Sequence, residues 1–412
     1  MYLSTEERSM LAGAEGSAVQ KAMQIIVALA EIYDAQQLLA IASAQVAGVS
    51  YKNLGDAGLE FLSEWAAQGA RVRVPSFMNP AGMDLERWRE MGISPEFAAK
   101  QKHVVDALAA MGVARTCTCT PYLVGHEPSA GEHLAWSESS AVSYANSILG
   151  ARTNREGGPS ALASAIVGRT AAYGLHLEEN RYATHLIEVQ CALHNEADFG
   201  ALGYMVGRCV VDGVPYFRLA KQQQLAPSSE HWMALGASMA AMGAVALYHV
   251  EGTTPEALHA LPLDWEIPRI VVDDLSDAHA ALNSPMNEVD FVSLGCPHST
   301  LGDIERVAQL LEGKRVKATL WITTSRHVRE RARRVGWVSQ IENAGGKVFA
   351  DTCLVVAPIE EMGFQGMATN SAKAAFYGPS HSKLERRFGT MEQCVEAALS
   401  GRWVRVADSH GH

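Results

Sequence analysis

Apolar and polar residues alternate with two different periods along the first part of the chain. Residues 14–35 carry apolar side chains at helical spacing, and so do residues 56–70, with a glycine near their end at Gly69. Residues 37–48 and 71–78 are shorter apolar runs with the character of strands. Helical and strand-like segments that alternate in this way predict a parallel sheet with helices on its faces.

The same alternation returns in the last third of the chain. Its strand-like runs are residues 269–275, 290–296, 317–324 and 347–353. Helical patterns at residues 300–313 and 326–346 separate the later runs. This order predicts a doubly wound, mainly parallel α/β domain.

The middle of the chain is less regular. Residues 204–219 predict a hairpin around Asp212-Gly213, because an Asp-Gly pair between apolar runs favours a tight turn. Residues 231–250 predict a buried helix followed by a strand rather than a membrane span. A proline-containing stretch at 258–269 predicts a boundary. We therefore expect an N-terminal α/β domain at 1–200, an irregular segment at 201–265 and a C-terminal α/β domain at 266–412.

Composition and charge narrow the class of protein. The chain has 412 residues, of which 48% are hydrophobic and 19% charged, so it can build more than one packed core. Its net charge of -11 argues against a nucleic-acid partner but leaves room for a local pocket that binds an anionic small molecule. The polar first ten residues do not resemble a signal peptide, and seven widely spaced cysteines suit a reducing compartment. We expect a cytoplasmic protein with no membrane partner.

Cysteines end strand-like runs at Cys119, Cys296 and Cys353. Ligands of open parallel sheets bind beyond the carboxyl ends of the strands, so these thiols can converge. Three thiolates from separate loops could hold an iron–sulfur cluster with one open iron position. The alternative is that they are buried packing residues, because no local CxxC pair is present. His298, two residues after Cys296, is the histidine nearest to this proposed site.

The other cysteines are assigned by pattern. Cys117 lies two residues from Cys119 and would point the same way from a strand, so spacing does not separate the two. Cys191, Cys209 and Cys394 fall within amphipathic patterns, and we predict that they belong to the core.

A polar stretch before residue 168 offers an anion site. Residues 157–168 begin with two glycines and a proline, which suits the first turn of a helix with free N–H groups. Arg152 and Arg155 lie just upstream. The alternative is an ordinary helix start whose neighbouring arginines pair with Glu138 or Glu156. Lys373, in the loop "TNSAKAAFY", could bind an anion or donate a proton, and a solvent-exposed lysine is the alternative there.

Taken together, these stretches resemble the aconitase X family over nearly the whole chain. The resemblance is carried by "QKAMQIIVALAEIY", "SAQVAGVSYKNLGDAGLEFL", "NPAGMDLERWREMGI", "TCTCTPYLVG", the long segment from "GEHLAWSESS" to "SAIVGRT", "LGCPH", "ADTC" and "TNSAKAAFY". It implies an aconitase-like multidomain architecture and an iron–sulfur hydro-lyase. It also implies cluster ligation by Cys119, Cys296 and Cys353, with the nuclearity of the cluster left open.

Family members dehydrate either mevalonate 5-phosphate or cis-3-hydroxy-L-proline. The resemblance favours conversion of mevalonate 5-phosphate to anhydromevalonate 5-phosphate, with the hydroxyproline reaction as the alternative. The catalytic residues that we predict are Ser371 and Lys373. The predicted substrate-binding residues are Ser43, Gln45, Asn79, Ser137, Glu138, Arg152, Asn154, Arg155, Ser160 and Asn370.

One part of the family pattern is not found in this sequence. The family's small swivelling domain, fused or separate, carries a Gly- and Ser-rich loop, and we find no such loop here. We therefore expect an architecture that lacks the swivel domain and a small subunit that supplies it. Two alternatives remain, namely a hydro-lyase with a single iron bound by some of the same ligands and a non-catalytic scaffold with a vestigial site.

Overall fold

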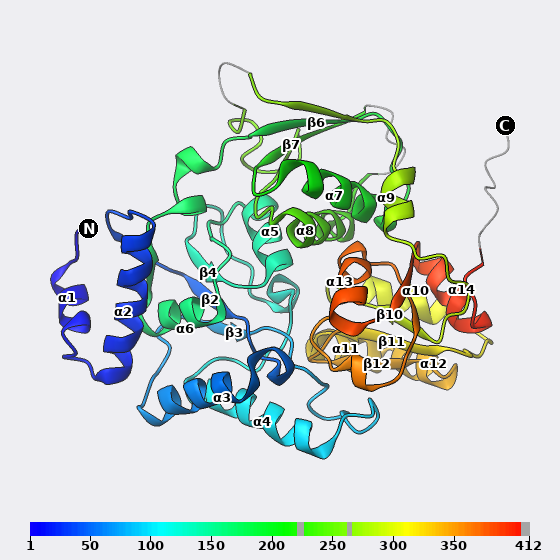
Figure 1. Cartoon of the computed structure of the whole chain (residues 1–412), viewed down its shortest axis with the longest axis horizontal. Helices are drawn as coiled ribbons and strands as arrows, with labels where there is room; N and C mark the ends of the chain where they lie inside the picture. Colours follow the sequence, from blue (N-terminus) through cyan, green and yellow to red (C-terminus); the bar gives the residue numbers. More distant parts are fainter. Residues whose placement is uncertain (221–225, 262–265, 405–412) are drawn as a thin grey trace.

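The computed structural model describes residues 1–220, 226–261 and 266–404. The chain folds as three consecutive regions, each with helices packed around parallel strands (Figure 1). In Figure 1 the first region occupies the blue and cyan side, the middle region is green, and the C-terminal region runs from yellow to red. This is the α/β architecture that the alternating pattern predicts.

The first region contains a short parallel sheet and a two-stranded antiparallel pair. The sheet has the strand order β3-β2-β4, and β1 pairs with β5. Its strands are β1 (Leu38–Ala40), β2 (Ser43–Val46), β3 (Ser76–Met78), β4 (Leu134–Trp136) and β5 (Arg169–Ala171). Its helices are α1 (Thr5–Leu11), α2 (Ser17–Ile32), α3 (Tyr51–Ala67), α4 (Pro95–Ala110), α5 (Ser139–Ser147) and α6 (Gly158–Val167), with 3-10 turns η1 (Pro121–Val124), η2 (Gly174–His176) and η3 (Glu178–Asn180).

The middle region is a regular parallel sheet with the strand order β8-β7-β6-β9. Its elements are β6 (His185–Val189), α7 (Glu196–Val210), β7 (Pro215–Leu219), α8 (Ser229–Gly243), β8 (His249–Val250), β9 (Arg269–Val272) and α9 (Ser276–Ala281). The helix and strand predicted at 231–250 are present as α8 and β8. The predicted hairpin is wrong, because Asp212-Gly213 joins a helix to a strand that pairs in parallel with β6.

Close contact between α7 and α8 explains why the hairpin pattern misleads. The two helices pack against each other along most of their length. A Cβ atom added at Gly243 would lie 1.9 Å from the carbonyl oxygen of Gly207, so this approach requires glycine. Gly207, inside the segment predicted as the first strand of the hairpin, therefore serves helix packing. The strand at β9 also departs from expectation, since it pairs with β6 instead of joining the C-terminal sheet.

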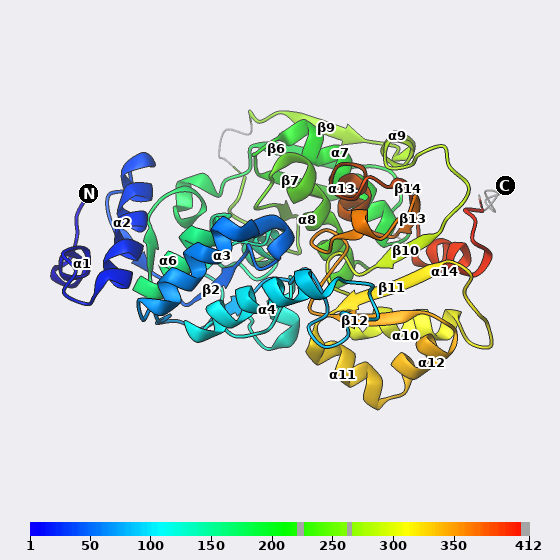
Figure 2. The same cartoon turned by 60° about the horizontal axis from the view of Figure 1, so that its bottom comes forward.

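The C-terminal region is a doubly wound parallel sheet with the strand order β12-β11-β10-β13-β14. Its strands are β10 (Phe291–Leu294), β11 (Thr319–Thr324), β12 (Lys347–Ala350), β13 (Gly366–Thr369) and β14 (Glu385–Phe388). Its helices are α10 (Leu301–Leu310), α11 (Arg326–Arg334), α12 (Trp337–Asn343), α13 (Ala372–Ser382) and α14 (Met391–Ser400), with the 3-10 turn η4 (Ile359–Glu361). Figure 2 shows α11 and α12 on one side of the sheet and α13 on the other.

The strand order reverses between β10 and β13, which are neighbours in this sheet. Such a reversal leaves a crevice at the carboxyl ends of the two strands, where open α/β sheets bind their ligands. α13 follows β13 directly and packs against α7 and α8 of the middle region. The crevice therefore faces the junction of the regions rather than open solvent.

Shared cores hold the three regions together. One buried cluster joins Met83, Trp88 and Met91 of the first region to Phe291 and Phe349 of the C-terminal sheet.

Within the described ranges, no helix combines the length and apolar character needed to cross a membrane. The middle sheet draws strands from both sides of residue 200, and part of the predicted boundary at 258–269 lies outside the described residues. The domain boundaries stay a prediction.

Candidate active site

Three cysteines from separate loops line one cavity of about 220 Å³. Cys296 lies two residues beyond β10 and Cys353 three residues beyond β12, so both leave the carboxyl edge of the same sheet. Cys119 belongs to the first region, in the irregular segment before η1. The sequence expectation that Cys119 ends a strand is wrong, although its side chain reaches the same cavity.

The cavity that Cys119, Cys296 and Cys353 line is called the cysteine cavity below, and its thiols interact with one another. The hydrogen bond between Cys296 and Cys353, followed by burial, raises the pKa of Cys296 well above its ordinary value. Burial raises the pKa of Cys119, whose Sγ accepts a hydrogen bond from the backbone N–H of His298 at 3.2 Å. Cys119 and Cys296 therefore favour the protonated thiol, and a bound metal centre would replace those protons.

The donor set fits an iron–sulfur cluster. Three thiols share a cavity that has room beside them, and thiolates from separate loops are the ligands such clusters use. The side-chain oxygen Oδ1 of Asn79, another lining residue, is buried and has no hydrogen-bond partner among the described atoms. Within the described residues, no group of three His, Cys, Asp or Glu side chains lies close enough together to enclose a single metal ion.

His298 ties the three cysteine loops to one another. Its Nδ1 bonds the hydroxyl of Thr118 at 2.9 Å, and its Nε2 lies 3.0 Å from the carbonyl oxygen of Thr352. Thr118 adjoins Cys119 and Thr352 adjoins Cys353, so each contact reaches a residue next to a cysteine. Burial lowers the pKa of His298 to about 4, which keeps the imidazole neutral near pH 7. A neutral ring has one donor and one acceptor, which matches its two partners.

The structure separates the two neighbouring cysteines. Cys117 is buried in the hydrophobic core of the first region, with a left-handed φ of 43°. Cys119 turns the other way into the cavity. The predicted strand is absent here, which is why the two side chains do not share a direction. Of the cysteines predicted as core, Cys394 is buried, Cys191 is half-buried, and Cys209 is exposed, so the prediction for Cys209 is wrong.

Lys373 and Glu138 form a buried ion pair on the wall of the cysteine cavity. The Lys373 ammonium also donates to the hydroxyl of Ser139 at 3.1 Å. The alternative of an exposed lysine is excluded, because Lys373 is only 8% exposed. Burial alone would lower the pKa of Lys373, yet the charge of Glu138 raises it above its ordinary value. Lys373 is therefore held protonated inside the site.

Glu138 is fixed by the start of α5. Its carboxylate caps this helix and accepts a hydrogen bond from the N–H of Ala141 at 2.8 Å. Burial would raise its pKa, but the charge and hydrogen bond of Lys373 bring the net shift below the ordinary value. Gln45 accepts from the Glu138 N–H at 3.2 Å and donates to the Thr118 carbonyl at 3.2 Å. Gln45 thus links the ion pair to the loop of Cys119.

The residues of the predicted anion segment do not all reach the cysteine cavity. Arg155 lines the cysteine cavity, together with Asn79 and Ser137. Its guanidinium donates to the carbonyl of Ala240 at 3.3 Å and has no carboxylate partner among the described residues. Neither arginine pairs with Glu138 or Glu156, in contrast to the alternative raised from the sequence.

Four predicted substrate-binding residues lie outside the cysteine cavity and make scaffold contacts. Arg152 pairs with Glu178. Asn154 bonds the backbone of Tyr173 and Leu175, and Ser160 donates to Glu156 at 2.5 Å. Ser43 accepts a hydrogen bond from the Trp136 indole at 3.1 Å. These contacts build the walls behind the site.

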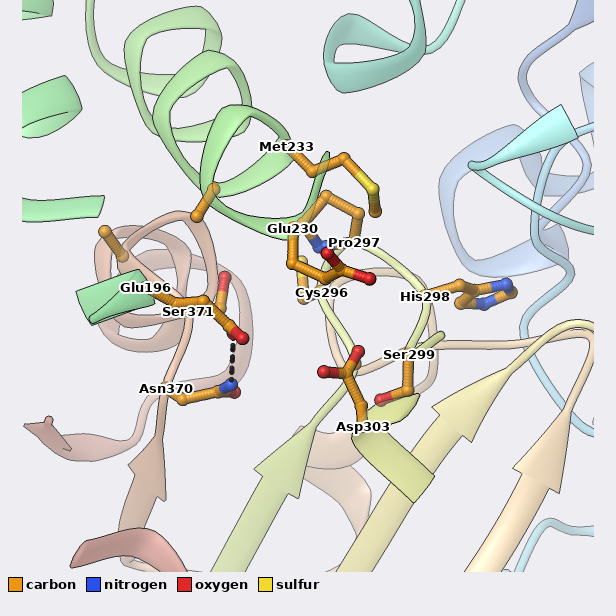
Figure 3. A pocket seen from close by; sticks show the side chains of 13 residues that line it. Glu196, Glu230, Met233, Cys296, Pro297, His298, Ser299, Asp303, Asn370 and Ser371 are labelled. Carbon is orange, nitrogen blue, oxygen red and sulfur yellow. Dashed lines mark hydrogen bonds between the residues drawn. The ribbon is translucent and has the colours of Figure 1, made fainter. Parts of the chain in front are cut away.

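Asn370 and Ser371 line a second cavity, which shares Cys296 and Pro297 with the cysteine cavity (Figure 3). Ser371 caps α13, since its hydroxyl accepts from the N–H of Ala374 at 3.1 Å.

Sequence reasoning missed part of the lining. Tyr377 and His381 of α13 line the cysteine cavity beside Lys373. The three residues are spaced four apart, which places them on one face of a helix. That spacing was a usable signal, because α13 begins at Ala372, inside "TNSAKAAFY".

Known proteins similar to this chain define its class. Sequence models of the aconitase X first domain, second domain and third domain match residues 1–179, 183–279 and 289–400. The chain therefore belongs to the aconitase X family. A solved structure of Thermococcus kodakaraensis aconitase X in its holo-form superposes with a TM-score of 0.89 at 46% identity, covering 97% of this chain and 100% of the other.

Characterised relatives point to a more particular class. The phosphomevalonate dehydratase large subunit of Methanothermobacter thermautotrophicus is 51% identical over 387 residues, 93% of this chain and 96% of the relative. The subunit of the same name from Methanosarcina mazei is 46% identical over 412 residues, all of both chains. Cis-3-hydroxy-L-proline dehydratase of Pseudomonas aeruginosa is 34% identical over 411 residues, 97% of this chain and 70% of that protein.

Proposed function

We propose that this chain is the large subunit of an iron–sulfur-dependent hydro-lyase that dehydrates mevalonate 5-phosphate to anhydromevalonate 5-phosphate. The observation that carries the proposal is the convergence of Cys119, Cys296 and Cys353 on a cavity that also holds the Glu138–Lys373 pair. Two relatives that bear the phosphomevalonate dehydratase name match 93% and 100% of this chain. The reaction removes one water molecule and needs no other reactant.

The three cysteines would hold the cluster as thiolates. When bound, the cluster supplies an open iron that acts as a Lewis acid toward the substrate hydroxyl. His298 keeps the three loops in register, and Gln45 keeps Glu138 beside them. The nuclearity of the cluster stays open, and a site with a single iron is the alternative.

Lys373 is proposed to give the leaving hydroxyl its proton. Its ammonium faces the cavity, and Glu138 keeps it charged and in place. A proton donor at a fixed position contributes about 10²–10⁴-fold to such steps. The base that removes the proton from the neighbouring carbon is expected on the partner subunit. Ser371 stays a predicted catalytic residue, in the second cavity that Cys296 also lines.

Arg155 is proposed to bind the anionic end of the substrate. It reaches the cysteine cavity without a carboxylate partner among the described residues, so its guanidinium fork is available for a phosphate or carboxylate. Asn79 and Ser137 lie on the same lining and offer further polar contacts. Arg152, Asn154, Ser160, Ser43 and Asn370 stay predictions whose contacts in this structure are structural.

The partner is proposed to be a small subunit that carries the swivelling domain. Relatives named as large subunits support a heteromeric enzyme. We further propose a cytoplasmic location. We also propose that the domains divide at residues 200 and 265. Cis-3-hydroxy-L-proline is the alternative substrate, supported by relatives at 34% and 33% identity.

The test is anaerobic co-expression with a small-subunit gene encoded beside this chain. We expect iron and sulfide in the purified complex and water loss from mevalonate 5-phosphate, followed by the absorbance of the new double bond. The isolated chain is expected to show little turnover. Turnover of cis-3-hydroxy-L-proline alone would replace the substrate, and iron without sulfide would replace the cluster by a single-iron site.

A further inference from the structure

A second cavity, here called the acidic cavity, shares Cys296 and Pro297 with the cysteine cavity (Figure 3). Its lining includes Glu196, Glu230 and Asp303, which come from the first turns of α7, α8 and α10. The acidic cavity continues into a wider space of about 380 Å³ that shares these three carboxylates and Asn370. It is therefore reached from the junction of the middle and C-terminal regions.

The carboxylates of the acidic cavity lack positive partners. Glu196 accepts one hydrogen bond from Asn370 at 3.5 Å, and Asp303 accepts one from the N–H of Thr300 at 2.8 Å. None of the three forms an ion pair with a lysine or arginine in the part of the chain that the structure describes. Burial, reinforced by the neighbouring carboxylates, raises the pKa of Glu196 to about 8. Glu230 differs, because the hydroxyls of Ser228 and Ser229 donate to it at 2.7 and 3.0 Å and bring its pKa below the ordinary value despite burial. Glu196 therefore lies beside other carboxylates without a compensating cation among the described residues.

Ser299 provides an independent sign of a missing ligand. Its side chain is only 4% exposed and lines the acidic cavity, beside Asp303 in Figure 3. Its hydroxyl makes no hydrogen bond to any described residue, whereas its backbone N–H and C=O are both bonded. A ligand with N–H donors would satisfy both the hydroxyl and the carboxylates.

The arrangement of the carboxylates in the acidic cavity favours a lysine or arginine side chain over a single metal ion. Among the described residues no three acidic or metal-binding side chains are close enough to enclose one ion. A guanidinium presents five N–H donors across a plane, and an ammonium presents three on a long stem, so either can reach separated oxygens. The wider space leads outward from the acidic cavity, which suits a side chain that enters from another protein.

We propose that the acidic cavity receives a basic side chain, an arginine or a lysine, from the small-subunit partner. This inference rests on the proposed function, which names that partner. The incoming charge would lie near Cys296 and Pro297, which line both cavities. Docking of the partner would thereby be coupled to the position of a proposed cluster ligand.

The test is the affinity of the full chain for its co-encoded small subunit, measured by calorimetry. We expect the double variant E196Q/D303N to bind about 10- to 100-fold more weakly, the loss typical of a charged hydrogen bond. The control E31Q/E60Q removes two exposed carboxylates from α2 and α3 and should bind like the parent. The free E196Q/D303N chain should unfold at the same or a higher temperature, because a repulsion is removed.

Each other outcome has a definite meaning. If the parent chain binds no small subunit, the proposed function loses its partner and this inference fails with it. If the parent and E196Q/D303N bind equally well, the proposed function stands and this inference is overturned. If Mg²⁺ or Mn²⁺ alone raises the unfolding temperature of the parent but not of E196Q/D303N, the cavity binds a metal ion and this inference is also overturned.

Discussion

Glu138 and Glu196 are carboxylates at helix starts, one in each of the two cavities that share the Cys296–Pro297 loop. Glu138 faces Lys373, and its pKa lies below the ordinary value despite burial. Glu196 has no lysine or arginine partner among the described residues and accepts one hydrogen bond, from Asn370, while burial and then Asp303 raise its pKa to about 8. The helix N-terminus favours both charges, so the difference comes from the presence or absence of a cation.

This contrast shows which charges the fold completes by itself. In the cysteine cavity the chain supplies both members of the ion pair, so that wall is preorganised before any substrate arrives. In the acidic cavity the described residues supply carboxylates but no lysine or arginine that pairs with them. The proposed partner subunit would supply that positive charge. The loop of Cys296 and Pro297 therefore lines both a cavity whose buried charge is paired and a cavity whose carboxylates have no lysine or arginine partner among the described residues.

The largest effect is expected from the loop itself. Replacing Cys296 by serine removes a proposed thiolate ligand, and the iron content of the anaerobically purified chain should fall at least about tenfold. Elemental analysis and visible absorption measure this loss. Cys117→Ser is the matched control, because Cys117 is buried in the first-region core and should leave iron in place. Full iron in Cys296→Ser would show that the metal is not on this loop.

The next effect concerns the completed pair. Lys373→Met keeps the length of the side chain but leaves the Glu138 charge buried without its cation. Removing one member of a buried pair lowers the free energy of unfolding by about 3–5 kcal/mol. Urea unfolding at pH 7 measures the change, with Lys373→Met/Glu138→Gln as the control that should recover part of it. Equal stability of Lys373→Met and the parent would mean that the pair is not buried in solution.

Sequence patterns predict which site residues leave the same edge of a sheet better than they predict which side chains meet in the site. Cys296 and Cys353 follow clear apolar runs, so their common edge could be predicted from the rule for open parallel sheets. Cys119 follows no strand in the structure, so the strand pattern that pointed to it was wrong, although the family resemblance indicates the same residue. The doubly wound C-terminal sheet was predicted, but the membership of β9 was not, since a strand's own residues do not specify its neighbour.

Pairing across long sequence separations set the limit of prediction. Glu138 and Lys373 are 235 positions apart and meet only because α13 packs at the junction of the regions. Arg152 and Arg155 looked equivalent in the sequence, yet one meets Glu178 and the other reaches the cysteine cavity. The acidic cavity combines the starts of three helices, a convergence that no local pattern contains.

A smaller effect should separate those two arginines. Arg155→Ala is expected to weaken binding of mevalonate 5-phosphate to the two-subunit enzyme about 10- to 100-fold, because a bidentate charged contact is lost. Arg155→Lys should restore only part of it. Arg152→Ala, whose partner is Glu178, serves as the control and should bind substrate nearly normally with unchanged iron. If Arg152→Ala is the damaging variant, the anion lies on the other side of the wall.

The smallest effect is a pH dependence confined to the acidic cavity. Besides Glu196, the titratable and charged groups that line its wider space are His194, Glu230, His231, Asp303, Arg306 and Glu392. Burial, then Asp303, raises the pKa of Glu196 to about 8 from 4.5, so the folded chain binds a proton that the unfolded chain releases. Stability from this group is therefore fully present below about pH 4.5 and is lost as the pH rises toward about 8.

The free parent chain should accordingly lose about 1–2 kcal/mol of unfolding free energy between about pH 6 and pH 8 through this group. Glu196→Gln cannot release the proton, so its denaturation curves at the two pH values should lie closer together. Glu31→Gln, on the exposed face of α2, should keep the full pH dependence of the parent. A parent chain that gains stability over this range, with Glu196→Gln removing the gain, would mean that Glu196 already meets a cation within the free chain. The contrast with Glu138 would then disappear.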